Sequence, residues 1–335
     1  MEEKQILTVS ASPHVKSTAT TRRIMLDVII ALIPAAFAGV TVFGLRAALV
    51  IAVCVLSSVM FEYLSRRLMK RDCTVGDLSA VVTGLLLAFN LPVSIPLWMC
   101  VVGAFAAIVV VKQFFGGLGQ NFANPAITAR IVLLVSFASA MTGFTSPVAG
   151  GVDAVSTATP LNILSSADGT SVAQLVANGE LPSLLKMFLG VRAGCIGETC
   201  AAALLLGGVY LLARGVIKPA IPFSFIGTVA VISLFASRFD LTWTAYELLG
   251  GGLLLGAFFM ATDYATSPVN TGGKIVFGVG CGILTAVIRL YGSLPEGVSY
   301  SILLMNIACP LIEKLTQPKY FGFIKSKKKK EGKAA

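Results

Sequence analysis

The sequence predicts an all-α integral membrane protein with about ten transmembrane helices, arranged as a five-plus-five inverted repeat with two interrupted helices. This prediction rests on the composition, on the spacing of the apolar segments and on a correspondence between two short segments. Of the 335 residues, 56% are hydrophobic and only 13% are charged, and the mean hydropathy is +0.86. A soluble domain has about 25% charged residues. A surface with so few charges cannot face water on all sides, so the chain belongs in a bilayer.

Ten apolar segments divide the chain. A transmembrane helix needs about 20 apolar residues. Eight segments are full-length candidates, at 24–44, 47–63, 96–111, 127–141, 195–213, 219–237, 275–291 and 298–315. Two further segments, 78–91 and 248–261, are shorter and are interrupted by glycine or proline.

The two short segments correspond to each other. Each follows an acid, Asp77 or Glu247, and then contains Gly-Leu-Leu-Leu from Gly84 or Gly252, a small residue and phenylalanine. Each is the third segment of its half. Because each half has an odd number of spans, the second half enters the membrane from the opposite side and is inverted relative to the first. Paired interrupted helices in an inverted repeat mark a functional site near the bilayer midplane.

The distribution of basic residues predicts the topology. With the N-terminus inside, 20 of the 26 lysines and arginines fall in predicted cytoplasmic parts, as the positive-inside rule requires. This count places Lys112 in the cytoplasm and Arg289 outside. The predicted parts are a cytoplasmic segment (1–23), a first membrane half (24–142), an extracytoplasmic loop (143–193), a second membrane half (194–315) and a basic cytoplasmic tail (316–335).

Ionisable residues inside predicted spans are functional candidates, because they are costly in lipid. They are Asp27, Arg130, Glu198 and Asp263. Asp263 has threonines at 262 and 266, and carboxylates with hydroxyls suit a hard cation. The alternatives are a helix-end carboxylate for Asp263 and pairing with a neighbouring helix or subunit for Asp27. Four further acids lie at span ends, where we expect them to be hydrated: Glu62, Asp77, Glu247 and Glu313.

Composition also excludes several classes of site. The seven cysteines show no CxxC spacing and the chain has a single histidine, His14, so an iron–sulfur, haem or multi-histidine metal site built by this chain alone is not expected. No dinucleotide-binding fingerprint is present. The net charge of +10 follows from the positive-inside rule and the tail, and no nucleic-acid partner is expected.

Two polar motifs remain. GGLGQNFANPA, at 116–126, combines glycines, whose backbone can approach a ligand closely, with the amides of Asn121 and Asn124. It is either the lining of a ligand or ion path or a helix-packing surface of small residues. The loop segment DAVSTATPL, at 153–161, contains Ser156, Thr157 and Thr159.

Five segments in order resemble the RnfD/NqrB family, which contains the RnfD component of Rnf-type ion-translocating ferredoxin:NAD oxidoreductases. They are SPH at 12–14 before the first span, GGLGQNFANPA, DAVSTATPL, GETCAAALLLGG at 197–208 and LLLGAFFMATDYATSP at 253–268. The resemblance covers nearly the whole chain.

This resemblance implies two flavins. In the family, FMN is joined through its phosphate to the last threonine of an S-G-A-T-like motif by a flavin transferase, and the matching residue is Thr159. The motif begins at Ser156 and has Thr157 where glycine is commonest, so Thr157 is an alternative attachment site. A noncovalent riboflavin is the second implied flavin, with Asn121 and Asn124 as candidate contacts. Arg130 could neutralise a flavin phosphate or a buried acid.

The resemblance further implies a membrane subunit of a redox-driven pump that couples electron transfer between ferredoxin and NAD to Na⁺ or H⁺ translocation. The implied partners are the A, B, C, E and G components of the Rnf complex, the flavin transferase and the lipid of a prokaryotic inner membrane. This chain alone holds no complete active site. A passive channel or secondary transporter for a small solute is the alternative function, and a purely structural scaffold is a third.

Overall fold

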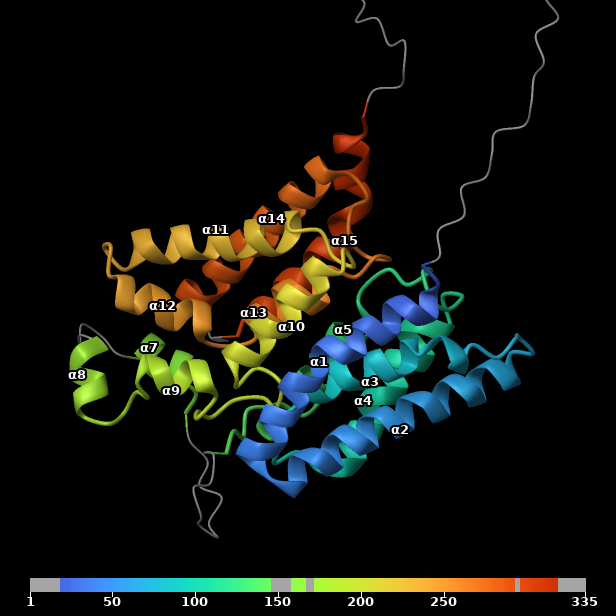
Figure 1. The fold of residues 1–335 in the computed structure, drawn as a ribbon, viewed down its shortest axis with the longest axis horizontal. Coiled ribbons are helices and arrows are strands. Elements are labelled where there is room, and N and C mark those ends of the chain that lie inside the picture. Colours follow the sequence, from blue (N-terminus) through green and yellow to red (C-terminus); the bar gives the residue numbers. More distant parts are fainter. Residues whose placement is uncertain (1–18, 146–157, 167–171, 293–295, 319–335) are drawn as a thin grey trace, which may run out of the picture.

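The computed structural model describes residues 19–145, 158–166, 172–292 and 296–318, and the regular structure in these ranges is helical. The predicted all-α class is therefore confirmed (Figure 1). Ser156, Thr157 and His14 lie outside the described residues.

The first half of the chain contains seven regular segments. They are α1 (Thr21–Phe43), α2 (Leu45–Leu68), the 3₁₀ turn η1 (Val75–Asp77), α3 (Ser79–Phe89), α4 (Leu97–Phe105) with its π-helical continuation η2 (Ala106–Gln113), and α5 (Pro125–Ser136). A short α6 (Ala138–Met141) follows. Three short helices then cross the predicted loop: α7 (Pro160–Ser166), α8 (Val172–Ala177) and α9 (Leu184–Leu189).

The second half begins with α10 (Ala201–Ala213) and α11 (Ala220–Ala236). It continues through α12 (Leu241–Leu249), α13 (Leu253–Leu255), the π-helix η3 (Gly256–Met260), α14 (Thr271–Tyr291) and α15 (Val298–Thr316). In Figure 1, α7, α8 and α9 lie at the left of the molecule, far from the start of α1 and the end of α15.

Four helices, α1, α2, α14 and α15, are long and apolar enough to cross a membrane. The pair formed by α12 and α13–η3 makes a fifth candidate, bent by 61° at its break. Five shorter apolar helices occupy the remaining predicted segments: α3, α4–η2, α5, α10 and α11. These helices agree with an integral membrane protein, and the ten crossings stay a prediction.

The two predicted interruptions differ. The segment 248–261 is broken, because Gly251 adopts a left-handed backbone (φ +58°) between α12 and α13. Arg289 stabilises the break: its guanidinium donates to the carbonyls of Glu247 and Gly250 at the end of α12, at 2.7 and 3.3 Å. By contrast, α3 runs unbroken through Gly84. It is short because Leu78, in a left-handed conformation (φ +65°), precedes it.

The predicted span 195–213 becomes helical only at Ala201. The backbone N–H groups of Ile196 and Gly197 instead donate to the carbonyls of Leu91 and Phe89, beyond and at the end of α3. A Cβ atom on Gly197 would lie 2.2 Å from the Cβ of Phe89, so only glycine permits this approach. Residues 195–200 therefore form a buried turn.

Candidate functional site

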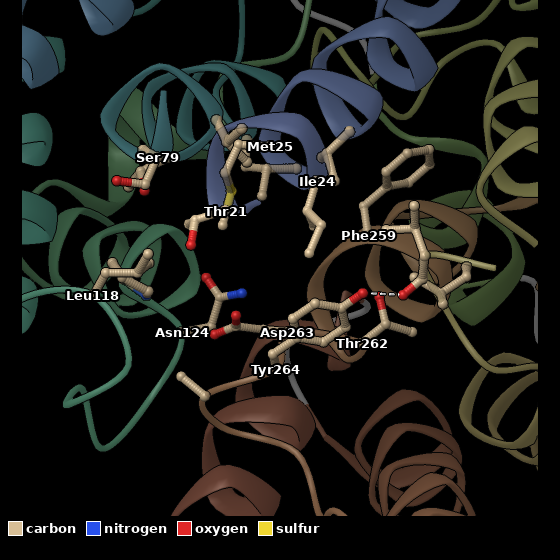
Figure 2. A pocket seen from close by; sticks show the side chains of 18 of the residues that line it. Thr21, Ile24, Met25, Ser79, Leu118, Asn124, Phe259, Thr262, Asp263 and Tyr264 are labelled. Atoms are coloured by element: carbon tan, nitrogen blue, oxygen red, sulfur yellow. Dashed lines mark hydrogen bonds between the residues drawn. The ribbon is translucent and has the colours of Figure 1, made fainter. Parts of the chain in front are cut away.

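A cavity of about 260 Å³ lies among α1, α3, the glycine-rich loop and η3. Its walls are mostly apolar, and its polar side chains include Thr21, Ser79, Asn124 and Asp263. In Figure 2, Asn124 and Asp263 lie close together on one side, while Ile24 and Met25 descend from α1 on the opposite side. We call this space the Asn124 cavity.

Asp263 lies just after η3 and lines the Asn124 cavity. Its carboxylate accepts a 3.1 Å hydrogen bond from the hydroxyl of Thr266. The hydroxyl of Thr262 instead donates to the carbonyl of Phe258, at 2.7 Å. The structure thus brings together Asp263 and Thr266, and Thr262 contributes to the cavity without bonding the acid. The side-chain amide of Asn121 donates to the carbonyl of Ala123, at 3.0 Å.

Asn124 is held rigidly at the start of α5. Its side-chain oxygen accepts from the backbone N–H of Ala126 at 3.0 Å, as an N-cap residue does. Its amide nitrogen donates to the carbonyl of Met260, at 3.2 Å. Of the preceding glycines, Gly119 lines the cavity, and a Cβ on Gly117 would lie 2.2 Å from the guanidinium of Arg66.

Arg130, on α5, is buried at the centre of a second polar group. One guanidinium nitrogen donates to Asn90 Oδ1 at 2.9 Å and to Ser299 Oγ at 3.0 Å. The other contacts the Sγ atom of Cys195 at 3.7 Å and pairs with the carboxylate of Glu296. The Arg130 side chain therefore joins α5 to three segments that are distant in sequence: the end of α3, the turn at 195–200 and the start of α15.

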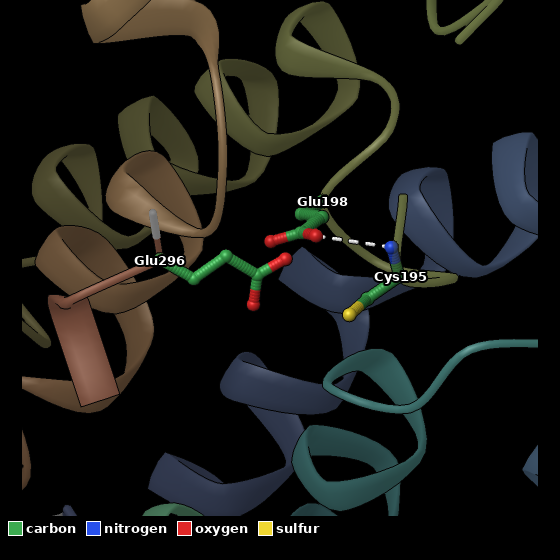
Figure 3. Close-up of side chains that lie close together, drawn as sticks. All are labelled: Cys195, Glu198 and Glu296. Atoms are coloured by element: carbon green, nitrogen blue, oxygen red, sulfur yellow. Dashed lines mark hydrogen bonds between the residues drawn. The ribbon is translucent and has the colours of Figure 1, made fainter. Parts of the chain in front are cut away.

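Glu198 and Glu296 form a carboxylate pair beside Arg130. Their oxygens and the Sγ atom of Cys195 lie within 4.8 Å of one another, and Figure 3 shows the two carboxylates directed toward each other. Glu198 also accepts from the backbone N–H of Cys195, at 3.0 Å. Burial and the neighbouring Glu198 carboxylate raise the pKa of Glu296 to about 7. Arg130 compensates the charge of Glu296 through their ion pair.

Thr159 is at the start of α7, with only 6% of its surface exposed. Its Oγ1 atom accepts from the backbone N–H of Asn162, at 3.3 Å. Asn162 in turn lines a small cavity of about 60 Å³ with Arg130, Glu296 and Ser299, which we call the Arg130 cavity. The predicted attachment residue and the buried cluster therefore lie on the same side of the protein.

Asp27 lies apart from both cavities. Its carboxylate accepts from the hydroxyl of Tyr210 at 3.0 Å and pairs with Arg214, just after α10, at 3.4 Å. The structure thus supports the alternative for Asp27, in which it pairs with a neighbouring helix.

Two further ion pairs contradict sequence-based expectations. Glu62 is completely buried and pairs with Lys112 at 2.9 Å, so neither residue is hydrated. Glu247 is also buried and pairs with Arg289, at 2.9 Å. Hydropathy places these charges near span ends, but only tertiary packing shows that they face each other. Glu296 was missed because it lies between two predicted spans.

Comparisons with known proteins agree with the resemblance. The model of the NQR2, RnfD, RnfE family matches residues 8–322. The chain is 48% identical over 324 residues to the D component of the Na⁺-translocating ferredoxin:NAD⁺ oxidoreductase complex of Acetobacterium woodii, with 96% of this chain and 97% of the relative covered. It is 45% identical over 323 residues to the D component of the proton-translocating ferredoxin:NAD⁺ oxidoreductase complex of Clostridium ljungdahlii, with 96% and 97% covered. It is 34% identical to the D component of the ion-translocating oxidoreductase complex of Escherichia coli K12, with 95% and 99% covered.

Proposed function

Because the chain belongs to the NQR2, RnfD, RnfE family, we propose that it is an electron-carrying membrane subunit of an ion-translocating ferredoxin:NAD oxidoreductase complex. The observation that carries this proposal is the near full-length similarity to the D components of two such complexes. The relatives' names differ in the ion, Na⁺ or H⁺, so the ion moved here is one of these two.

Thr159 carries a covalent FMN in this proposal. Its hydroxyl oxygen would form the phosphoester, and its place at the start of α7 puts the flavin beside the Arg130 cavity. The cavity offers a cationic guanidinium, the hydroxyl of Ser299 and apolar walls from Leu134, Met141 and Phe144. Apolar walls with a few polar groups are typical of cofactor sites. Flavin supplies electron transfer. The cavity of about 60 Å³ is too small to enclose a flavin, so these residues would contact only part of it, and Arg130 would balance its negative charge.

The Asn124 cavity is the proposed site of a noncovalent riboflavin. Its volume of about 260 Å³ is close to the lower end of ligand pockets, about 300 Å³. Phe258 and Phe259 offer apolar contact for a flat ring, and Asn124, Thr21 and Asp263 offer hydrogen bonds. The adjacent π-helix η3 is of a kind found frequently at functional sites.

The remaining parts of the proposal concern architecture and partners. The ten apolar segments form an inverted repeat that crosses the prokaryotic inner membrane ten times, with both termini cytoplasmic. The ferredoxin and NAD sites lie on other components of the complex, in the set A, B, C, E and G. A flavin transferase attaches FMN.

In-gel fluorescence of the denatured polypeptide tests the covalent flavin. The wild-type band should fluoresce, and a peptide containing Thr159 should carry the mass of FMN less water. Thr159→Ala should abolish the fluorescence, whereas Ser156→Ala should retain it. A fluorescent Thr159→Ala band would move the attachment, with Thr157 as the next candidate, and a dark wild-type band would overturn the proposal.

Flavin released on denaturation tests the second site. Val82 lines the Asn124 cavity, so Val82→Phe should reduce the riboflavin released while the covalent signal remains. Leu85, on the same helix, is not among the lining residues and provides the matched control, Leu85→Phe. Equal release from both variants would place riboflavin elsewhere.

A further inference from the structure

The two cavities approach each other across a short part of α5. Asn124 lines one and Arg130 lines the other. The two residues are six positions apart, which is about 9 Å along a helix axis. The Asn124 cavity reaches Thr21 at the start of α1, and the Arg130 cavity reaches Asn162 on α7. The start of α1 and α7 lie at opposite ends of the helical bundle in Figure 1.

A short series of contacts runs from Asn124 to Arg130 by way of Met260 and Asn90. The amide of Asn124 donates to the backbone carbonyl of Met260 at 3.2 Å, and the amide of Asn90 contacts Met260 Sδ at 3.6 Å. Arg130 then donates to Asn90 Oδ1, at 2.9 Å. Asn90 and Arg130 are only 2% and 4% exposed. Such groups are costly within a membrane and usually serve a function there.

The charges along this route have a definite order. Asp263 lines the Asn124 cavity, and Glu296 lines the Arg130 cavity with Glu198 beside it. Carboxylates at both ends attract cations. Between them is the guanidinium of Arg130, which stays protonated as arginine side chains do throughout proteins. Its partners Asn90, Ser299, Cys195 and Glu296 hold it in place.

We propose that Arg130 is an electrostatic barrier that prevents small monovalent cations from leaking between the Asn124 cavity and the Arg130 cavity. A fixed positive charge between two polar cavities repels cations that would cross from one to the other, as it does in selective pores. The subunit can then hold polar, cation-attracting cavities on both sides without dissipating the gradient that the complex builds. The proposal requires only that the chain spans the membrane, and it is independent of either flavin.

Passive ion flux into liposomes tests the barrier. The assembled complex is reconstituted without electron donor, and the entry of ²²Na⁺ and of protons, reported by a trapped pH dye, is measured separately. Arg130→Gln should raise the flux of at least one of the two ions tenfold or more, which corresponds to a barrier lowered by about 1.4 kcal/mol. Arg130→Lys keeps the charge and should stay tight. Arg214→Gln removes an arginine that lines neither cavity and should also stay tight.

Three results would overturn the proposal: Arg130→Gln liposomes as tight as wild type, equal leaks from the glutamine and lysine variants, or an equal leak from Arg214→Gln. If Arg130→Gln does not assemble, Asn90→Asp gives the same test, because a further carboxylate against the guanidinium, in addition to that of Glu296, would make the net charge of this cluster more negative and should raise the flux. In-gel flavin fluorescence is recorded for every variant. A tight wild-type protein without flavin, together with a leaky Arg130→Gln variant, would contradict the covalent flavin and support the barrier.

Discussion

Glu62 and Lys112 form an ion pair inside the first half of the protein, with a carboxylate oxygen 2.9 Å from the Lys112 Nζ atom. The two side chains are 0% and 2% exposed. The hydroxyl of Thr74 also donates to Glu62, at 2.7 Å, and Lys112 donates to Ser79 Oγ, at 2.6 Å. The pair therefore ties α2 to η2 and to the start of α3.

Removing one partner of this pair should be strongly destabilising. A buried charge left alone costs about 3–5 kcal/mol, so Glu62→Gln and Lys112→Gln should each lower the free energy of unfolding by that amount. The double variant should lose much less than the sum. Denaturation in detergent measures the four proteins. Asp27→Asn is the control, because its partner Arg214 is 43% exposed and such pairs contribute about 1 kcal/mol or less. Additive losses from the two glutamines would contradict the coupling.

The sequence predicts the apolar segments well and their tertiary relationships poorly. Hydropathy locates most of the apolar helices because lipid selects composition directly, but it misses most of α12. It cannot show that residues 195–200 stay non-helical, since this depends on the backbone of residues 89–91, more than 100 positions away. It also cannot find the Glu198–Glu296 pair, because Glu198 lies in the turn at 195–200 and Glu296 lies in the connection between α14 and α15. Thr159 is proposed as an attachment site only from its family motif, because a lone threonine carries no physical signal.

The break between α12 and α13 should depend on Gly251. An alanine there would keep a left-handed backbone, at a cost of about 1–2 kcal/mol, and its Cβ would lie 2.8 Å from a methyl group of Leu161. Gly251→Ala should therefore lower the melting temperature. Gly227→Ala, in α11, meets no atom within 4 Å and should be neutral or stabilising by about 1 kcal/mol. Equal melting temperatures for the two variants would show that the break does not need glycine.

Stability should depend on pH through Glu296. Burial and the Glu198 carboxylate raise its pKa from 4.5 to about 7. An acid with a raised folded-state pKa contributes stability that is complete below its ordinary pKa and is lost as the pH rises through the raised value. The wild-type protein should lose stability relative to Glu296→Gln between about pH 5 and 8. Glu180→Gln changes an exposed acid and should follow the wild type. Parallel wild-type and Glu296→Gln curves would contradict this origin.

The orientation of the chain in the membrane can be measured from the accessibility of two cysteines. Ser165 is exposed on α7, and Cys73, between α2 and η1, is the one exposed native cysteine among the seven. The predicted topology places Ser165 outside and Cys73 in the cytoplasm. An impermeant maleimide added to intact cells should label Ser165→Cys at once and Cys73 only after the membrane is opened. The reverse order would overturn the predicted orientation.

Asp263 should influence ion coupling without affecting the covalent flavin. Its carboxylate lines the Asn124 cavity, whereas Thr159 lies on the side of the Arg130 cavity. Carboxylate oxygens with nearby hydroxyls favour a hard cation, so loss of this charge should weaken cation binding. Asp263→Asn should therefore keep the in-gel flavin signal and lower ion-coupled turnover of the assembled complex, with partial recovery at high cation concentration. Asp72→Asn changes an exposed acid and should leave turnover unchanged. If Asp263→Asn matches the wild type in turnover and cation dependence, Asp263 is a hydrated helix-end carboxylate that plays no part in ion movement.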